Sequence, residues 1–401
     1  LSVSDDSRFV YSVETFGFVE GGTLQLAVGG VRARVPKGAD KSAGVNAAFV
    51  LRRVSSPENA VAVVENTAAT LGCVFDAAVL TSDDTVFNMS DVSLWRSQQF
   101  EVTVRRPGLY ALFFSVCQPV HTAFWYTLRA AFFNPGPDYL SAGERALPEL
   151  YSVSALLFAA FAVVWLVQLR SASKIHSVHH LMTVVLLLKT LALLFEAISY
   201  HFLRQKGHTD GWTVVFYVFA FAKGTMLFVV ILLIGTGWSL LKPFLADREK
   251  KILMVVLPLQ VVDNVAFVVL AYMAPGSMAF TTWSNVLHVV DLLCCFAVLL
   301  PVVWSLHHLK RAAAAGAGGD GKSAETLAKF RKYYLAVVAY LYFTRFVAYV
   351  VNAVLPFMFA WVGNAATEAA SVMFYVWVGY KFRPTAREGY LRVDAHDEEE
   401  A

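Results

Sequence analysis

Eight ionisable side chains lie inside long apolar segments, where a charge needs a physical explanation. They are Lys189, Glu196, Lys223, Asp263, His288, Asp291, Arg345 and Glu368. A charged group at the centre of a bilayer costs at least about 2.5 kcal/mol for Arg, Lys or Asp. We therefore predict that these side chains face the interior of a helical bundle and pair with one another.

The spacing of these residues indicates inward-facing rows. Lys189 and Glu196 are seven residues apart and share a helix face, and Asn285, His288 and Asp291 form an i, i+3, i+6 row. Two interpretations stay open. The residues form either an ion-pair network that fixes helix registry or a polar, lumen-facing cavity for a lipid headgroup, a lipidated cargo or a small polar ligand. An ion path ranks third, because the sequence shows neither a repeat nor paired broken helices.

The sequence offers little evidence for catalysis. The N-terminal region has no nucleophile–base motif and no His/Cys/Asp/Glu cluster with metal-ligand spacing. Residues 316–323 read GAGGDGKS and satisfy the P-loop expression. No strand precedes this run, which lies in Ala/Gly-rich sequence, so a linker is the better interpretation. We expect a protein that is not an enzyme and needs no metal or cofactor; a lipid is the one bound molecule left open.

Three further features concern processing and sorting. Cys73 and Cys117 are the only cysteines before the apolar segments, and we predict a disulfide between them rather than two free thiols. Asn88 begins the only N-glycosylation sequon. Tyr390 and Val393 fit a Tyr-x-x-apolar pattern similar to sorting signals that clathrin adaptors read. The alternative for this tetrapeptide is a solvated, disordered tail.

Seven apolar runs supply the elements that must position the ionisable residues. A crossing of the bilayer needs about 20 apolar residues, and the last run is short unless it extends to Tyr380. The runs span residues 151–169, 181–203, 213–241, 252–273, 283–306, 334–355 and 365–378. Composition agrees, because 57% of the chain is hydrophobic and only 16% is charged. The chain is therefore predicted to be a multi-pass membrane protein whose termini lie on opposite sides of the membrane.

The distribution of basic residues predicts the orientation. Lys and Arg crowd the segments after the first, third, fifth and seventh runs, whereas the alternate loops hold only Arg204 and Lys206. The positive-inside rule then places the C-terminus in the cytosol and the N-terminal domain in the lumen or outside the cell. Translocation of that domain implies a cleaved signal peptide before Leu1. The formal net charge of +3 gives no reason to expect a nucleic-acid partner.

The N-terminal region has the pattern of an antiparallel β-sandwich. Short β-branched and aromatic runs alternate with glycine turns such as Gly21-Gly22 and Gly29-Gly30. The predicted strands are 9–16, 23–28, 31–35, 47–54, 60–64, 99–104, 108–116 and 124–133. We predict a sandwich at 1–137, a linker at 138–149, a helical domain at 150–381 and a cytosolic tail at 382–401.

Several motifs occur in an order that resembles the lung seven-transmembrane receptor family, a group of GOLD-domain seven-transmembrane proteins with plant members described as candidate G-protein-coupled receptors. They are IGTGW at 234–238, VLPLQV at 256–261, VDLLCC at 290–295, YLYFTR at 340–345 and GYKFRP at 379–384. The resemblance covers the second to seventh runs and the proximal tail in detail. It implies a GOLD-like β-sandwich on a seven-helix bundle.

The resemblance also implies a function. It points to a trafficking or sorting receptor of Golgi and post-Golgi or endosomal membranes, and of the plasma membrane in some circumstances. The implied partners are membrane lipids, a lumenal protein or lipidated cargo, and a cytosolic adaptor at the tail. A G-protein-coupled signalling receptor is the alternative, and a channel or transporter is third. The alternative is weaker because Trp238-Ser239-Leu240 stands where an Asp/Glu-Arg-Tyr triplet would be expected.

Overall fold

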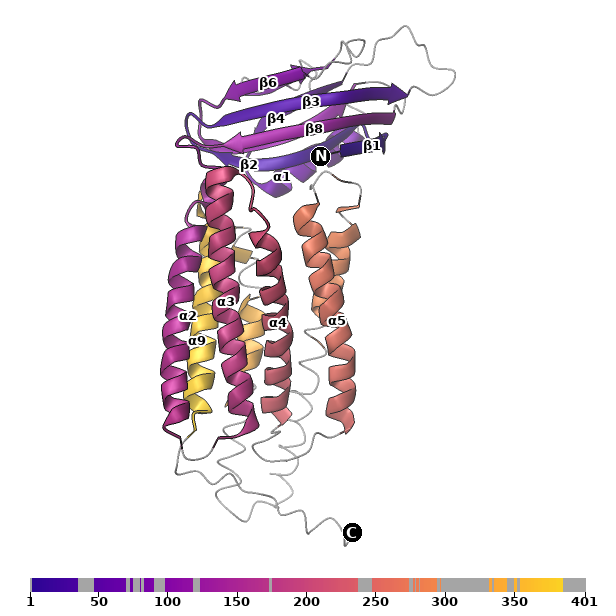
Figure 1. Cartoon of the computed structure of the whole chain (residues 1–401). Coiled ribbons are helices and arrows are strands. Elements are labelled where there is room, and N and C mark those ends of the chain that lie inside the picture. The colour runs from indigo at the N-terminus through magenta and orange to yellow at the C-terminus, as the bar shows by residue number, and fades with distance from the viewer. Residues whose placement is uncertain are drawn as a thin grey trace.

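A β-sandwich stands on one end of a helical bundle in the computed structural model of this 401-residue chain (Figure 1). We call the end of the bundle next to the sandwich the β-proximal end and the opposite end the β-distal end. The structure describes residues 2–34, 47–69, 73–74, 80, 83–89, 98–117, 123–172, 175–236, 247–273, 277, 279–280, 282–293, 296, 332–333, 335–344, 350–351 and 354–384.

The sandwich consists of two four-stranded antiparallel sheets. One sheet has the order β1 (Ser2–Asp6), β8 (Ala123–Phe133), β3 (Thr23–Arg34), β6 (Gln98–Thr103). The other has the order β2 (Val10–Phe18), β7 (Gly108–Val116), β4 (Ala47–Val54), β5 (Thr85–Asn88). This arrangement confirms the predicted antiparallel β domain.

Aromatic side chains fill the space between the two sheets. Phe114 of β7 lies with its ring centroid 5.5 Å from that of Phe124, and Phe49 of β4 lies 5.7 Å from Tyr126. Both contacts are edge-to-face, a preferred geometry of aromatic pairs. The alternation of inward apolar and outward polar residues along β3 and β8 follows from this shared core.

Residues 60–64, predicted as a strand, belong instead to helix α1 (Pro57–Ala69). The Ser56 hydroxyl accepts a hydrogen bond from the Asn59 backbone N–H at 3.2 Å, as an N-cap does, and Pro57 occupies the first turn. Ala60, with Val63 and Val64, packs on the outer face of the sheet that contains β7. Both faces of β7 are therefore covered, and every residue of this strand is buried.

The predicted turn at Gly29-Gly30 also needs correction. Strand β3 continues to Arg34, and its register against β8 shifts between Gly29 and Arg32. Gly30 has a φ of 64°, a left-handed conformation that glycine adopts without strain. The two glycines thus form a bulge within one long strand. Strands β1 and β5 were not predicted, because each is short and lacks a distinctive apolar alternation.

The bundle contains long helices that run between the two ends. They are α2 (Leu147–Arg170), α3 (Ser177–Lys206), α4 (Trp212–Thr236), α5 (Asp247–Tyr272) and α9 (Ala360–Lys381). Further helical residues lie within 282–293 and 332–344. Among the described residues, three helices, at Ala142–Arg170, Ser177–Lys206 and Trp212–Ile231, are long and apolar enough to cross a membrane.

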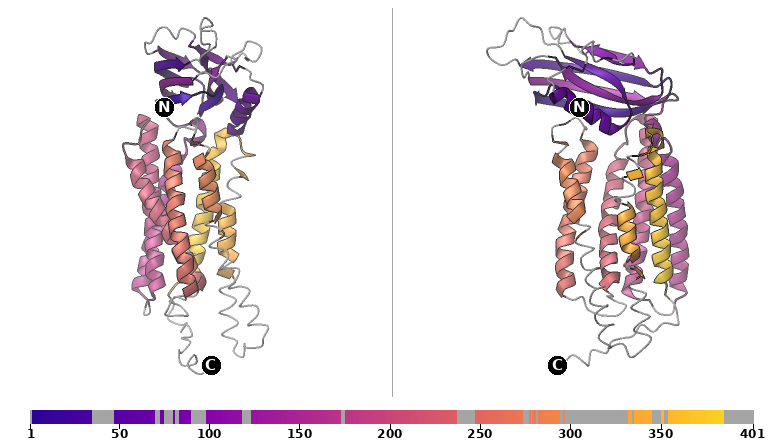
Figure 2. Two further views of the ribbon diagram at one scale, coloured as in Figure 1. Left: turned by 90° about the vertical axis from the view of Figure 1, so that its right-hand side faces the viewer. Right: turned by 180° about the vertical axis from the view of Figure 1, so that it is seen from behind.

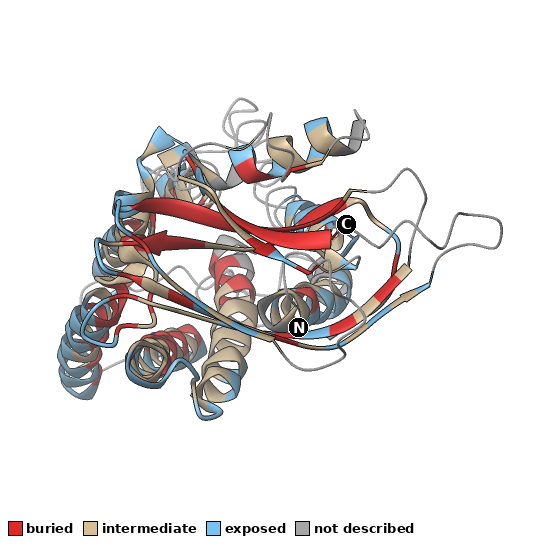
Figure 3. Ribbon diagram, turned by 90° about the horizontal axis from the view of Figure 1, so that it is seen from above, coloured by how far each residue is buried: buried red, intermediate tan, exposed pale blue. Residues whose placement is uncertain are grey.

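The outward faces of these helices carry exposed apolar side chains. On α2, Val153, Leu156 and Val163 are more than half exposed, whereas Phe158 and Ala162 face the bundle interior. Seen from the β domain, buried residues of the helices lie toward one another and exposed ones point outward (Figure 3). Such a surface suits contact with lipid rather than water. Helix α9 runs beside α2 in both further views (Figure 2).

Candidate functional site

A buried ion pair joins α3 to α9 in the middle of the bundle. The Nζ atom of Lys189 lies 2.9 Å from Oε1 and 2.7 Å from Oε2 of Glu368. Lys189 is 4% exposed, and its Nζ atom lies 5.4 Å from the centre of the Phe158 ring of α2. A cation over an aromatic face gains electrostatic energy. The lysine is therefore held between a carboxylate and a ring.

Glu196 and Lys223 extend this pair into a cluster. The Tyr151 hydroxyl of α2 donates a hydrogen bond to the Glu196 carboxylate. Glu196 interacts electrostatically with Lys223 of α4, and also with Glu368 and Lys189. The cluster thus holds two cations and two carboxylates and has no formal net charge. We call Lys189, Glu196, Lys223 and Glu368 the charge cluster.

The charge cluster can hold helices together without a ligand. Burying an ion is expensive unless it is paired and hydrogen-bonded, and here each sign is matched within the cluster. A charge-balanced arrangement needs no additional ion to neutralise it. Its contacts link α3, α4 and α9.

The structure does not bring all eight predicted residues into this cluster. His288 is exposed, and its Nδ1 atom lies 2.6 Å from the Ser284 carbonyl oxygen. Asp263 and Asp291 are half-buried, on α5 and on the 282–293 segment, and both have interacting partners. Arg345 lies outside the described residues. Tyr151 was missed by the sequence reasoning, because a tyrosine at the start of an apolar run carries no distinctive signal.

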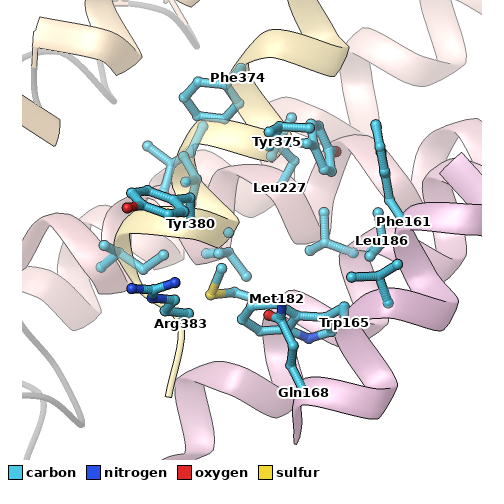
Figure 4. A pocket seen from close by; sticks show the side chains of 18 of the residues that line it. Phe161, Trp165, Gln168, Met182, Leu186, Leu227, Phe374, Tyr375, Tyr380 and Arg383 are labelled. Carbon is cyan, nitrogen blue, oxygen red and sulfur yellow. The ribbon is translucent and has the colours of Figure 1, made fainter. Parts of the chain in front are cut away.

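A cavity among the described residues of the bundle is distinct from the polar, lumen-facing one that the sequence left open, which stays a prediction. It has a volume of about 370 Å³ and lies toward the β-distal end, between α2, α3, α4, α9 and Tyr333. Its lining is mostly apolar, with Gln168 and Arg383 at the β-distal side (Figure 4). The apolar lining arises because aromatic and branched aliphatic side chains meet there, whereas the charged residues of the cluster pair with one another elsewhere.

A hydrogen-bonded network forms the β-distal base of this cavity. The Trp165 Nε1–H of α2 donates to the Thr183 hydroxyl at 3.0 Å. The Nδ1 atom of His179 accepts from the His176 backbone N–H, so its Nε2–H donates to the Phe382 carbonyl at 3.1 Å. His179 is only 1% exposed. These bonds connect the β-distal ends of α2, α3 and α9.

The β domain shows the predicted covalent link. Cys73 and Cys117 form a disulfide with Cα atoms 5.1 Å apart, as the sequence indicated. The bond joins the segment after α1 to the end of β7. Asn88 is exposed at the end of β5, where a glycan has room, and its use remains a prediction. Tyr390 and Val393 lie outside the described residues, as does the GAGGDGKS run. Among described residues, no group of three or more His, Cys, Asp or Glu has metal-binding geometry.

A buried polar junction ties the β domain to the bundle, and the sequence reasoning treated its residues only as a linker. Asp138 is 3% exposed and accepts hydrogen bonds from Arg145 Nε at 2.8 Å and from the Leu140 backbone N–H at 3.0 Å. Arg204, near the end of α3, approaches the same carboxylate at 3.3 Å. The Tyr139 backbone N–H donates to the Arg204 carbonyl.

Asn134 completes this junction from the sandwich side. Its side chain is fully buried, and Oδ1 accepts from the Val19 backbone N–H at 2.8 Å. Nδ2 donates to the carbonyls of Gly17 at 3.2 Å and Leu140 at 3.0 Å. One amide therefore links the end of β2 to the chain that enters the bundle. We call Asn134, Asp138, Arg145 and Arg204 the junction.

A carboxyl group beside the junction makes stability depend on pH. Burial is the main reason that the pKa of Glu14 in β2 is raised from 4.5 to about 6; the hydrogen bond from the Thr15 backbone N–H opposes this rise, and the negative charge of Glu144 adds to it. The folded state therefore binds a proton more readily than the unfolded state, so this contribution to stability is lost as pH rises toward about 6. We expect the β domain to lose about 1 kcal/mol between about pH 4.5 and about pH 6, after allowance for partial solvent exposure.

Thermal unfolding of the full chain at several pH values checks this prediction. Glu14→Gln should stabilise the protein near neutral pH and flatten the profile. Glu20→Gln is the matched control, because Glu20 is exposed in the turn that follows β2. Parallel pH profiles for the wild type and Glu14→Gln would contradict the assignment.

Comparison with known proteins gives a family match for each of the two parts of the chain. Residues 146–388 match the family described as "GOST, seven transmembrane domain", and residues 1–134 match "CAND6/7, N-terminal domain". The chain belongs to the GOST seven-transmembrane family. The Arabidopsis thaliana protein "Candidate G-protein coupled receptor 6" is 36% identical over 413 aligned positions, which cover 100% of this chain and 92% of that relative.

Family membership fits the structure at both ends of the chain. The GOST domain begins at residue 146, one residue before α2, and the CAND6/7 domain ends at residue 134, directly after β8. Asp138 and Arg145 of the junction lie in the segment between them, whereas Asn134 is the last residue of the first match and Arg204 belongs to the second. The protein is thus a seven-transmembrane, receptor-like membrane protein with an N-terminal β domain.

Proposed function

We propose that the protein is a trafficking or sorting receptor of Golgi and post-Golgi or endosomal membranes, whose β domain binds lumenal cargo. The observation that carries this proposal is the outer face of the sheet β1-β8-β3-β6 (Figure 1). Helix α1 covers the other sheet. On this sheet the outward positions of the central strands carry exposed polar side chains such as Gln25, Arg32 and Arg129.

The polar face is ordered enough to recognise a partner. Gln25 of β3 donates a hydrogen bond to Glu101 of β6 at 3.2 Å across the strands. Exposed arginine and glutamine side chains on a rigid sheet supply directional donors for a folded protein surface. The charge cluster, in contrast, is satisfied by its own partners. This contrast favours recognition of cargo by the β domain over recognition of an ionic ligand in the bundle.

The junction gives the β domain a defined position on the membrane domain. Asp138, Arg145 and Arg204 connect the two parts through short polar contacts. Basic residues Arg170 and Lys381 lie at the β-distal ends of α2 and α9 and support a cytosolic location for that end. The β domain then faces the lumen, and the tail with Tyr390 faces cytosolic adaptors.

Signalling through a G protein is the second candidate, and the name of the Arabidopsis relative is the observation in its favour. The two functions make different demands on the tail. A sorting receptor needs the Tyr390 motif for its steady-state location. A signalling receptor needs a response that depends on ligand and on G protein.

Localisation of the tagged full-length chain tests the proposal. Tyr390→Ala should move the protein from Golgi and endosomal membranes toward the plasma membrane without loss of folding. Arg392→Ala is the control, because position 392 is one of the two unspecified positions of the motif. Arg129→Glu on the sheet face should leave the location unchanged but reduce crosslinking to lumenal proteins.

Two results would overturn this function. One is an unchanged location for Tyr390→Ala together with a ligand-dependent G-protein response in the wild type. The other is crosslinking to lumenal proteins that depends neither on Arg129 nor on any other part of the β domain.

A further inference from the structure

The apolar cavity at the β-distal end has the form of a slot open to the side of the bundle. Its deep wall is made of buried residues of α3 and α4, including Val185, Ile231 and Ile234. Its rim on α2 and α9 includes Val164 and Tyr380, which are 55% and 65% exposed. These exposed side chains lie on the outer surface of the helices. The slot therefore opens between α2 and α9 toward the hydrocarbon of the membrane.

Most of the slot is lined by apolar side chains, and polar side chains lie at one end of it. Figure 4 shows Phe161, Phe374 and Tyr375 on one side, with Gln168 and Arg383 at the other. Gln168 lies two residues before the end of α2, and Arg383 lies two residues after the end of α9. The ends of membrane-spanning helices lie near the headgroup region. The polar end therefore lies at the depth of headgroups, and the apolar part at the depth of acyl chains.

The position of Arg383 is set by the residue before it. The Phe382 carbonyl accepts the hydrogen bond from buried His179, and the Phe382 backbone N–H donates to the Val378 carbonyl at 2.9 Å. The Phe382 ring is 5% exposed and packs edge-to-face on Tyr333, with centroids 5.2 Å apart. The chain therefore leaves α9 in one fixed direction.

The Arg383 side chain stays available for a ligand. It is exposed, and its guanidinium carbon lies 4.7 Å from the centre of the Tyr380 ring at the rim of the slot. An arginine held on an aromatic face keeps its outer N–H donors free for a phosphate. The backbone anchor and the ring together reduce the entropy that Arg383 loses when it binds.

We propose that this slot binds an anionic phospholipid of the leaflet remote from the β domain. One acyl chain occupies the apolar slot, and the headgroup phosphate lies against Arg383 and Gln168. The volume of about 370 Å³ falls within the usual range of small-molecule pockets. A sideways opening admits a lipid directly from the bilayer, whereas a soluble ligand would have to cross hydrocarbon. The cationic residue at the entrance favours a negative headgroup over a zwitterionic one. This inference is independent of the cargo function.

Binding of defined lipids to the delipidated full-length protein tests the proposal. The probes are phosphatidylserine and phosphatidylcholine with the same acyl chains, measured by native mass spectrometry from detergent micelles. Arg383→Gln should weaken phosphatidylserine binding by about fivefold and leave phosphatidylcholine binding unchanged. Lys381→Gln is the matched control, because Lys381 lies two residues away and does not line the slot. It should change binding by less than about twofold.

A second variant tests occupancy of the slot itself. A Cβ atom at Gly379 would meet only the Trp165 ring, at 3.9 Å, so a leucine can enter the cavity without displacing backbone. Gly379→Leu should reduce binding of both lipids because it fills the space of the acyl chain. Equal affinities of the wild type for the two lipids, or unchanged phosphatidylserine binding in Arg383→Gln, would overturn the proposal. An equal loss of phosphatidylserine binding in Lys381→Gln would indicate a general effect of surface charge and would also overturn the proposal.

Discussion

Replacement of Lys189 by methionine will destabilise the membrane domain by about 3–5 kcal/mol. Methionine has nearly the same length and fills the space beside Phe158, so lost packing contributes little. The loss comes from Glu368, whose carboxylate would stay buried without the ammonium group that now lies 2.7 Å away. The cluster would then hold two carboxylates and one cation, and Glu196 and Glu368 would repel each other.

The double substitution Lys189→Met/Glu368→Met separates charge balance from packing. It removes one charge of each sign and leaves Glu196 and Lys223 as a balanced pair. Exchange of a buried ion pair for apolar side chains is often neutral or stabilising, so the double variant should recover most of the lost free energy. Unfolding in mixed micelles of dodecylmaltoside and SDS provides the measurement.

Lys206→Met is the matched control on the same helix. Lys206 also pairs with a carboxylate, that of Asp210, but both side chains are substantially exposed. The loss there should be below about 1 kcal/mol. Similar losses for Lys189→Met and Lys206→Met, or a double variant as unstable as the sum of the single ones, would mean that charge balance does not govern the cluster.

The sequence predicted the parts of this protein that depend on local periodicity. The strand predicted at 23–28 lies within β3, whose alternation buries Leu24, Leu26 and Val28 on the inner face. The seven-residue spacing of Lys189 and Glu196 placed them on one face of α3, and both take part in the charge cluster. The high cost of burying a charge in lipid makes such inward positions predictable without knowledge of the partners.

Predictions failed where short segments gain their structure from tertiary contacts. The run Ala60–Val64 resembles a strand because three of its five residues are valine. It is a helix because Ser56 and Pro57 begin one and the sheet beneath supplies an apolar surface. The helix-start signal was present in the sequence, but the prediction gave more weight to the β-branched composition of the run.

The slot could not be predicted at all. Its lining comes from four long helices and Tyr333, spread over more than two hundred residues of sequence, and apolar residues on a lipid-facing helix look like those that line a cavity. Arg383 alone carried a hint, as a cation just past the last helix. That position is also what the positive-inside rule explains without any ligand.

The junction was missed because Asn134 and Asp138 flank a Pro-Gly-Pro run that reads as a simple turn, while Arg204 reads as a charge in a loop. Asn134 is nevertheless among the most constrained side chains of the molecule. Its amide bonds to Val19, Gly17 and Leu140, three backbone groups on two separate segments. We expect Asn134→Ala to destabilise the protein by about 3 kcal/mol, because these three buried backbone groups would lose their hydrogen-bond partner and alanine could not replace it.

Asn134→Asp sharpens this test, since aspartate has the same shape as asparagine. It keeps the acceptor for the Val19 N–H but places an oxygen where Nδ2 now faces two carbonyl oxygens. The variant should therefore be at least as unstable as Asn134→Ala, and protease cleavage between the β domain and α2 should become faster. Asn66→Ala in α1 is the control, because Asn66 is exposed, and it should change stability by less than about 0.5 kcal/mol. A stable Asn134→Asp protein with slow cleavage would mean that the β domain is held on the bundle by Asp138, Arg145 and Arg204 without help from Asn134.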